Sequence, residues 1–207
     1  MENEHLDNNK AVIIGMVTSD MVFSHEVYGE KFYSLNLDVS RLSETSDIIR
    51  ATISERFFGT LYPAIGDKLL IKGQFRSYNN FSNIGNKLIL TVFVKDIERV
   101  EDLSVFPNPN SIFLNGYVCK PPIYRTTPFQ REIADILLAV NRSYNKSDYI
   151  PCIAWGRNAK FAENLSVGAN IKIWGRIQSR EYQKRISDDE FETKTAYEIS
   201  ISKLENN

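Results

Sequence analysis

Basic and aromatic residues alternate with apolar residues along one segment of the chain, residues 170–183. Ile171, Ile173 and Ile177 occupy odd positions of this segment. Because successive side chains of a β-strand point to opposite faces, the even residues are predicted to share the outer face of a strand. Cations on such a face could bind anions, and its aromatic rings could stack on flat ligands. The even residues are Lys172, Trp174, Arg176, Gln178, Arg180 and Tyr182.

The segment 147–156 is predicted to be a second strand with the same division. Its apolar inner face consists of Ile150, Cys152 and Ala154. Its predicted outer face consists of Tyr149, Pro151, Ile153 and Trp155. The flanking segments contribute Arg142, Tyr144 and Arg157.

This combination of residues is typical of a surface that binds an unpaired nucleic-acid strand. Aromatic rings stack on bases at about 1–3 kcal/mol per base, largely regardless of which base it is. Cations neutralise phosphates and release counterions. An aromatic residue on a strand is more often part of a core, and a row of cations is usually solvated surface, but the joint pattern favours a binding face. The predicted binding residues are Arg142, Tyr144, Tyr149, Trp155, Arg157, Lys172, Trp174, Arg176, Arg180 and Tyr182.

Five strands are predicted to position these residues in the second half of the chain. They cover residues 111–120, 131–144, 147–156, 170–183 and 194–205. A short helix is predicted over 157–165, between the third and fourth strands, because Phe161, Ala162 and Leu165 recur at helical spacing. This order is that of the OB-fold, a five-stranded Greek-key barrel whose interior is filled by side chains, so a ligand must bind outside.

The first half of the chain repeats the second. Gly15 matches Gly116 and Asp47 matches Asp148 at an offset of 101 residues, and Gly73 matches Gly175 at an offset of 102. The first-half strands are predicted at 11–19, 31–41, 48–57, 68–78 and 87–98, with a helical piece near 58–64. We therefore predict an all-β chain of two tandem OB-folds, residues 1–104 and 111–207, joined by a linker over 105–110.

The two copies differ on the predicted binding face. Opposite Tyr144, Tyr149 and Trp155 the first half has Ser43, Ile48 and Ser54. Residues 1–103 carry 11 basic and 15 acidic side chains, whereas residues 104–207 carry 14 and 11. The first half is thus predicted to have a degenerate binding face. Weaker DNA contacts are expected there from Lys72, Arg76 and Tyr78.

The second half resembles the bacterial single-stranded DNA-binding protein family. The resemblance lies in the runs 140–144, 148–157, 175–182 and 197–201, and it covers most of residues 111–205. It implies an OB-fold that coats single-stranded DNA without catalysis, in replication, recombination and repair. Stacking aromatics of the family correspond to Tyr144, Tyr149, Trp155 and Tyr182, while Trp174 is predicted from its strand position alone.

The resemblance also implies partners beyond DNA. The family usually assembles four OB-folds, so two chains of two are expected to form a homodimer. Family members typically end in an acidic tail that recruits replication proteins. This chain ends at Asn207, directly after its last predicted strand, so recruitment through a tail is not expected.

Other functions are less well supported by the sequence. The histidines are His5 and His25 alone, and with Cys119 and Cys152 they offer no zinc spacing, so we expect no metal, no cofactor and no enzyme. Both thiols are predicted to be buried. No apolar run suits a membrane span and no secretion signal is apparent, which favours the cytoplasm. Two alternatives stay open: a protein-interaction scaffold in a primosome-like complex, and binding of single-stranded RNA.

Overall fold

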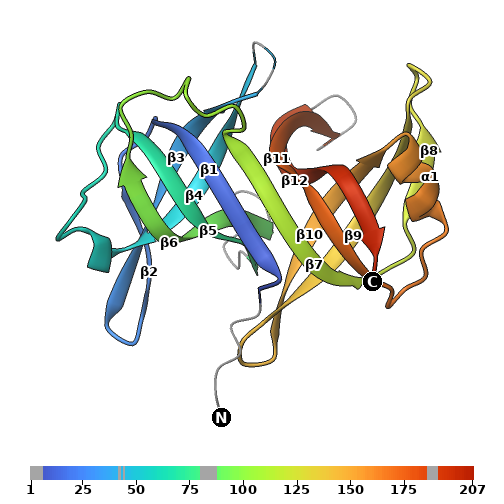
Figure 1. Ribbon diagram of the computed structural model, residues 1–207, viewed down its shortest axis with the longest axis horizontal. Helices are drawn as coiled ribbons and strands as arrows, with labels where there is room; N and C mark the ends of the chain where they lie inside the picture. The colour runs from blue at the N-terminus through green and yellow to red at the C-terminus, as the bar shows by residue number, and fades with distance from the viewer. Residues whose placement is uncertain (1–6, 42, 44, 80–87, 186–190) are drawn as a thin grey trace.

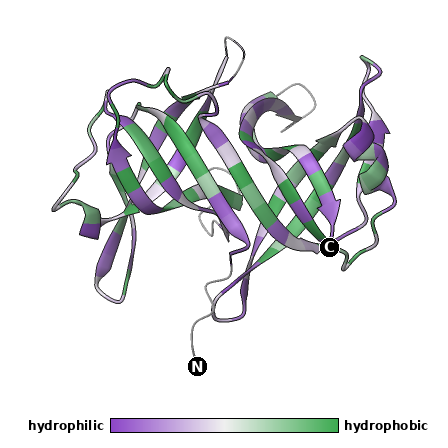
Figure 2. Ribbon diagram, viewed as in Figure 1, coloured by the Kyte–Doolittle hydropathy of each residue, from purple (hydrophilic) through white to green (hydrophobic). Residues whose placement is uncertain are grey.

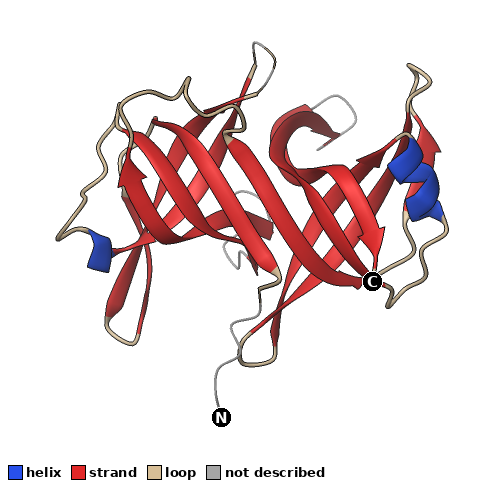
Figure 3. Cartoon of the chain, in the orientation of Figure 1, coloured by secondary structure: helices blue, strands red, loops and turns tan. Residues whose placement is uncertain are grey.

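The computed structural model describes residues 7–41, 43, 45–79, 88–185 and 191–207. Its regular secondary structure is almost entirely strand, and the strands form two barrels side by side (Figures 1 and 3). The strands of the first half are β1 (Asn9–Val17), β2 (Val22–Val27), β3 (Glu30–Ser40), β4 (Ser46–Ser54), β5 (Lys68–Asn79) and β6 (Leu88–Arg99). The second half contains β7 (Asn110–Val118), β8 (Ile123–Thr126), β9 (Glu132–Arg142), β10 (Lys146–Trp155), β11 (Asn170–Arg185) and β12 (Phe191–Asn206).

Each half closes into a ring of five strands. In the first half, β1 pairs with β3 and β5, β5 with β6, and β4 with β3 and, in parallel, with β6. In the second half, β7, β9, β10, β12 and β11 close in the same way, again with one parallel pair, β10 and β12. The helix α1 (Arg157–Glu163) follows β10 and precedes β11 in the chain, and it lies beside β8 (Figure 1). The predicted pair of OB-folds is confirmed.

The interior of each barrel is apolar. Side chains point alternately inward and outward along a strand, and Figure 2 shows hydrophobic and hydrophilic residues interspersed over the two barrels. Phe75, Leu37 and Ile71 are buried in the first barrel, and Ile150, Ile173 and Ile177 in the second. Barrels packed with side chains leave only their outer faces and loops for a ligand.

The repeated glycines lie where the two barrels need them. Strand pairing shifts register at Gly73 between β5 and β6, and at Gly175 between β11 and β12. A Cβ at Gly73 would lie 2.2 Å from the carbonyl oxygen of Phe93, and one at Gly175 would lie 2.2 Å from that of Ser200. A side chain at either position would therefore collide with the neighbouring strand. These glycines mark the same bulge in both copies.

The barrels are joined by an antiparallel pairing of their first strands. Residues 9–13 of β1 pair with residues 110–114 of β7. The chain between the barrels, from the end of β6 to the start of β7, covers residues 100–109. The division into domains at 1–104 and 111–207, with a linker over 105–110, remains our proposal for their limits.

A crossed pair of buried carboxylates also links the barrels. Asp47 at the start of β4 accepts hydrogen bonds from the backbone N–H and the hydroxyl of Ser179 on β11, at 2.7 and 2.9 Å. Asp148 at the start of β10 accepts a backbone hydrogen bond of 2.7 Å from Ser77 on β5. Both carboxylates are fully buried. The sequence repeat of these residues thus reflects a two-fold relationship in which each barrel binds the other.

The arginine partners of these carboxylates differ. Arg41 donates two hydrogen bonds to Asp47, at 2.8 and 2.6 Å. Burial raises the pKa of Asp47, but the hydrogen bonds from Arg41 and Ser179 outweigh burial and hold this pKa below its ordinary value. Arg142 Nε lies 3.3 Å from Asp148 Oδ2, where neither atom has a hydrogen-bond partner. Burial raises the pKa of Asp148 above its ordinary value despite the nearby Ser77 and Arg142.

Four details differ from the predicted elements. Strands β2 and β8 were not predicted, and each pairs with an edge of the ring. The helical piece expected near 58–64 is a 3₁₀ turn at Glu55–Phe57 instead, and the hydroxyl of Ser54 accepts a hydrogen bond from the backbone N–H of Arg56. Cys152 is buried as expected, whereas Cys119 lies just after β7 and is partly exposed. Within the described residues, no helix is long and apolar enough to cross a membrane.

We predict that Asp47→Asn and Asp148→Asn affect stability unequally. The folded protein holds the pKa of Asp47 below its ordinary value, so the ionised carboxylate stabilises the fold at pH values above that ordinary value. This stabilisation is present at pH 7 and is lost as the pH falls through the pKa of the folded state. The folded protein holds the pKa of Asp148 above its ordinary value, so the protonated carboxyl stabilises the fold at pH values below that ordinary value. This stabilisation is lost as the pH rises, and the ionised carboxylate costs stability at pH 7. Asp47→Asn should lower the free energy of unfolding at pH 7 by about 2 kcal/mol more than Asp148→Asn.

Urea unfolding of both variants at pH 7 measures this difference. The destabilisation by Asp47→Asn should shrink as the pH is lowered through the acid range, where the wild-type carboxylate takes up its proton. Equal losses for the two variants at pH 7 would show that the two arginine contacts are equivalent in solution.

Candidate nucleic-acid interface

Trp155 is the aromatic side chain at the centre of the predicted outer face. It ends β10 and is 36% exposed. Its indole Nε1 donates a hydrogen bond of 3.2 Å to the hydroxyl of Ser200 on β12, the strand parallel to β10. This bond fixes the orientation of the ring while leaving part of it in solvent. A ring held in this way can stack on a planar ligand without a large loss of side-chain entropy.

Arginines surround Trp155. The ring lies in a hollow of about 470 Å³, here called the Trp155 hollow. Within the described part of the chain, Glu198 is the acidic residue of its lining, and it is nearly buried. The positive potential of the hollow is therefore set by five arginines, which favours a polyanion. These arginines are Arg41, Arg125, Arg131, Arg176 and Arg180.

The arginines differ in how far protein carboxylates neutralise them. Arg41 is bound twice by Asp47, and Arg125 donates two hydrogen bonds to Asp135, at 3.1 and 3.0 Å. Arg176 reaches Asp47 only at 3.5 Å, and Arg180 reaches Glu198 only at 3.4 Å. Burial, followed by the charge of Arg41, lowers the pKa of Arg176. Arg176 and Arg180 are thus less closely paired with protein carboxylates than Arg41 and Arg125 are.

Two predicted outer residues form the floor of the Trp155 hollow. Ile153 is only 5% exposed and Gln178 only 8% exposed, although both line the hollow. Gln178 donates a hydrogen bond of 2.9 Å to Glu198, which explains how an amide is accommodated there. Strand alternation correctly placed these residues outside the core, but it did not reveal that neighbouring side chains cover them.

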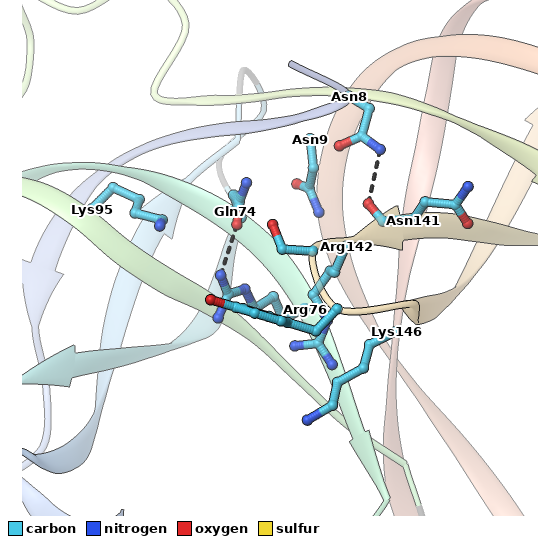
Figure 4. A pocket seen from close by; sticks show the side chains of 10 residues that line it. Asn8, Asn9, Gln74, Arg76, Lys95, Asn141, Arg142 and Lys146 are labelled. Atoms are coloured by element: carbon cyan, nitrogen blue, oxygen red, sulfur yellow. Dashed lines mark hydrogen bonds between the residues drawn. The ribbon is translucent and has the colours of Figure 1, made fainter. Parts of the chain in front are cut away.

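Tyr144 and Arg142 lie at a second hollow, between the two barrels. The hollow measures about 340 Å³ and is here called the junction hollow. Tyr144 is in the turn between β9 and β10, where its φ of 63° turns the chain back, and it is 86% exposed. Figure 4 shows Arg76 and Lys95 reaching this hollow from the first barrel, and Arg142 and Lys146 reaching it from the second.

Tyr149 lies on β10 between Tyr144 and Trp155. Its side chain is 51% exposed, whereas its backbone N–H donates a hydrogen bond of 2.8 Å to Ser77 of the first barrel. Tyr149 and Trp155 share an outward parity on the strand, and Tyr144 lies in the turn before it. Three exposed rings therefore follow one strand from the junction hollow to the Trp155 hollow.

The other predicted residues of the second half lie outside the two hollows. Trp174 packs against Phe113, with ring centroids 5.1 Å apart, and Lys203 Nζ lies 4.6 Å from the Trp174 ring. Tyr182 is partly exposed, with the guanidinium of Arg180 5.9 Å from its ring. Arg157 begins α1, and Lys172 lies on β11. The contribution of these residues to binding remains a prediction.

The weaker contacts expected in the first half occupy three different environments. Lys72 Nζ forms ion pairs with Asp96 and Glu98, at 3.2 and 3.1 Å. Arg76 lies in the junction hollow, with its guanidinium 3.7 Å from the ring centre of Phe93. Tyr78 lines a hollow of about 300 Å³ on the first barrel, together with residues such as His25 and Ile89. Of these three residues, Arg76 shares its hollow with Tyr144 of the second half, and Tyr78 has the guanidinium of Arg142 5.7 Å from its ring.

Several cations of the two hollows were missed in the sequence. Arg125 lies on β8, for which no strand was predicted, and Arg131 lies in the loop before β9, although the predicted strand 131–144 began at this residue. Arg41 and Lys95 belong to the other half, and strand alternation in one copy cannot place a residue of the other. The repeat of Arg41 at Arg142 was the available signal, because both arginines partner the carboxylates that join the barrels. In the described residues, no group of three or more His, Cys, Asp or Glu side chains is arranged to hold a metal ion.

Comparison with known proteins places the second half in a family. Residues 109–206 match the model of the single-strand binding protein family. Single-stranded DNA-binding protein 1 of Staphylococcus aureus (strain COL) is 37% identical over 83 residues, which are 37% of this chain and 50% of that protein. Single-stranded DNA-binding protein A of Bacillus subtilis is 33% identical over 103 residues, which are 46% of this chain and 59% of that protein. The chain thus spans about half the length of these relatives.

A solved structure is similar to both halves together. The wild-type single-stranded DNA binding protein from Thermus aquaticus aligns with a TM-score of 0.71 over 96% of this chain and 92% of that one. At 19% sequence identity, this likeness shows the fold alone. It agrees with the two closed barrels described above.

The electrostatics of the Trp155 hollow can be tested by fluorescence quenching. In a Trp174→Phe variant, Trp155 is the remaining tryptophan and its fluorescence reports on the hollow. The positive potential of the surrounding arginines should concentrate anions near its ring. Iodide should therefore quench this variant about twofold or more better than caesium does at low ionic strength, and added salt should reduce the difference. A Trp155→Phe variant serves as the control, because its remaining ring, Trp174, packs against Phe113. Equal quenching of Trp155 by the two ions would show that neighbouring carboxylates neutralise the arginines.

Proposed function

We propose that this chain, whose residues 109–206 match the single-strand binding protein family, binds single-stranded DNA without sequence specificity. The observation that carries the proposal is the partly exposed Trp155 ring among five arginines. Bases of a single strand would stack on the ring while arginines contact the phosphates. Duplex DNA keeps its base faces stacked inside, so the same surface offers it only charge.

The remaining roles follow from the family. We propose that the protein acts in DNA replication, recombination and repair, in the cytoplasm, by coating single strands rather than by catalysis. The relatives named above are single-stranded DNA-binding proteins by their names. Stacking on a base does not depend on the 2′-hydroxyl, so the choice of DNA over RNA rests on this family membership. Competition between oligo(dT) and oligo(rU) of equal length tests that choice.

We also propose that the protein works as a homodimer. One chain supplies two barrels, and two chains would supply the four OB-folds that are usual in the family. Sedimentation velocity should then give twice the 23.8 kDa mass of one chain. A mass of one chain at micromolar protein concentration would contradict the homodimer, and DNA would then be bound by the two barrels of a single chain.

A protein-interaction scaffold is the second candidate function. The observation in its favour is the first barrel, which has serine or isoleucine opposite the three aromatic residues of β10 and its turn. A scaffold requires that another protein cover Tyr149 and Trp155, and it predicts weak binding of oligo(dT) that moderate salt abolishes.

Intrinsic fluorescence tests the proposed function directly. Both tryptophans lie in the second half, so titration with an oligo(dT) of about 35 nucleotides should quench the fluorescence strongly and saturably at low salt. Higher salt should weaken the binding without abolishing the quenching at saturation. Absence of quenching at low salt would exclude Trp155 as a stacking residue and favour the scaffold.

Trp155→Ala should weaken binding of labelled oligo(dT) by about 1–3 kcal/mol, with little dependence on base sequence, because a stacking surface is lost. Fluorescence anisotropy of the label measures this loss without relying on the removed ring. Ile48→Ala is the matched control: Ile48 is an exposed residue of the first half at the position equivalent to Tyr149. An equal loss of affinity in both variants would refute the proposed asymmetry between the halves.

Arg180→Ala should change the salt dependence of binding. Arg180 is exposed, and its Nε is 3.4 Å from a Glu198 oxygen, so a phosphate can displace this weak ion pair. Removing one phosphate contact should reduce the slope of log K against log salt by about 0.7 to 1. An unchanged slope would show that Arg180 does not contact the strand.

A further inference from the structure

The junction hollow is basic on both of its sides. Arg76 on β5 and Lys95 on β6 line it from the first barrel, and Arg142 and Lys146 line it from the β9–β10 hairpin of the second. The other described residues of its lining are amides, Ser143 and Tyr144, so no carboxylate of the described chain faces the hollow. Figure 4 shows these cations converging on one space between the barrels.

Two arginines of the hollow have unused hydrogen-bond donors. The Nε atoms of Arg76 and Arg142 are buried and have no hydrogen-bond partner, although Arg142 Nε lies 3.3 Å from Asp148 Oδ2. Arg76 donates its described hydrogen bond, of 2.8 Å, to the neutral amide of Gln74. The guanidinium of Arg76 therefore has no charged partner among its described hydrogen bonds, and an anion in the hollow would supply one.

The like charges in the hollow are close enough to affect one another. Burial, followed by the charges of Arg76 and Arg56, lowers the pKa of Lys95. An anion bound between these cations would relieve their repulsion. This effect adds to the geometry, in which four cations already face one space.

Flat groups lie beside these charges. The guanidinium of Arg76 is stacked 3.7 Å from the ring centre of Phe93, which holds it in a fixed plane. Tyr144, 86% exposed, extends from the hairpin tip on the other side. A nucleotide combines a phosphate with a planar base, and the hollow of about 340 Å³ offers cations for the former and a ring for the latter.

The position of the hollow indicates a strand rather than a free nucleotide. The ten residues of β10 extend over roughly 30 Å from the hairpin to Trp155. Tyr149 is exposed between these ends, so rings occur at both ends and between them. A single strand stacked along β10 would arrive at the junction hollow with its next phosphate close to cations of the first barrel.

We propose that the junction hollow binds one nucleotide of the DNA strand and passes the strand from the second barrel to the first. Arg76, Lys95, Arg142 and Lys146 contact the phosphates, and Tyr144 stacks on a base. The first barrel thereby takes part in binding through its cations although it lacks the aromatic residues of the second. This inference rests on the proposed binding of single-stranded DNA.

The test compares Arg76→Gln/Lys95→Gln with Lys68→Gln. Lys68 lies at the opposite end of β5, where its Nζ donates a hydrogen bond to the backbone oxygen of Glu101. With an oligo(dT) of about 35 nucleotides, the double variant should reduce the slope of log K against log salt by about 1.4, since each single-strand phosphate contact accounts for about 0.7. Lys68→Gln should leave the slope unchanged. The single variants Lys95→Gln and Lys146→Gln change exposed side chains, so they retain the fold and should each reduce the slope by about 0.7.

Quenching of Trp155 separates failure of this inference from failure of the proposed function. In the double variant the quenching at saturation should match that of the wild type, because the second barrel is intact. Wild-type quenching together with an unchanged slope in all three variants would overturn the role of the hollow and leave single-strand binding in place. No quenching in the wild type would overturn both.

The cations of the hollow could instead bind a free phosphate ion, and this alternative needs its own test. Inorganic phosphate at the phosphate concentration of the oligonucleotide should not raise the melting temperature of the wild type. A rise with inorganic phosphate that the double variant abolishes would assign the hollow to a small anion and overturn the proposal.

Discussion

The relative placement of the two barrels depends on buried carboxylates that cross from one to the other. Asp47 of the first barrel binds Ser179 of the second, and Asp148 of the second binds Ser77 of the first. A buried carboxylate without partners would be very costly, so each barrel can only be docked where the other supplies its donors. The pairing of β1 with β7 adds a continuous sheet to this constraint. Both hollows follow from it, because it brings a hairpin of one barrel against the outer face of the other.

The sequence predicted the fold well because the repeat and the strand alternation are both local signals. Each of the ten ring strands was predicted, and the repeated glycines, such as Gly73 and Gly175, proved to be positions where a Cβ would meet a neighbouring carbonyl. The edge strands β2 and β8 were not predicted, and there is a physical reason for this. β8 has only four residues, and β2 exposes nearly all of its side chains, so neither carries the alternation that burial imposes on a ring strand.

The site was harder to predict, since alternation gives the direction of a side chain but not what covers it. Trp155 and Tyr149 are exposed as expected, whereas Ile153 and Gln178 point outward and are nearly buried under their neighbours. Trp174 has the parity of a binding residue, yet it packs on Phe113. Arg41 and Lys95 could not be assigned at all from one copy, because they reach the hollows from the other barrel. Their placement depends on docking, which the sequence repeat suggests only through the paired Asp47 and Asp148.

The two-fold relationship between the barrels does not extend to the arginines beside the two buried carboxylates. Arg41 is fully engaged by Asp47, a strong ion pair that stabilises the docking. Arg142, its counterpart, stands beside Asp148 without a well-formed hydrogen bond, and burial raises the pKa of that carboxyl. The looser pair contributes less to stability, and its arginine lines the junction hollow together with the exposed Tyr144. The two copies of the network therefore differ in the geometry of the arginine beside each buried carboxylate, a difference that the repeat of Asp47 and Asp148 in the sequence does not reveal.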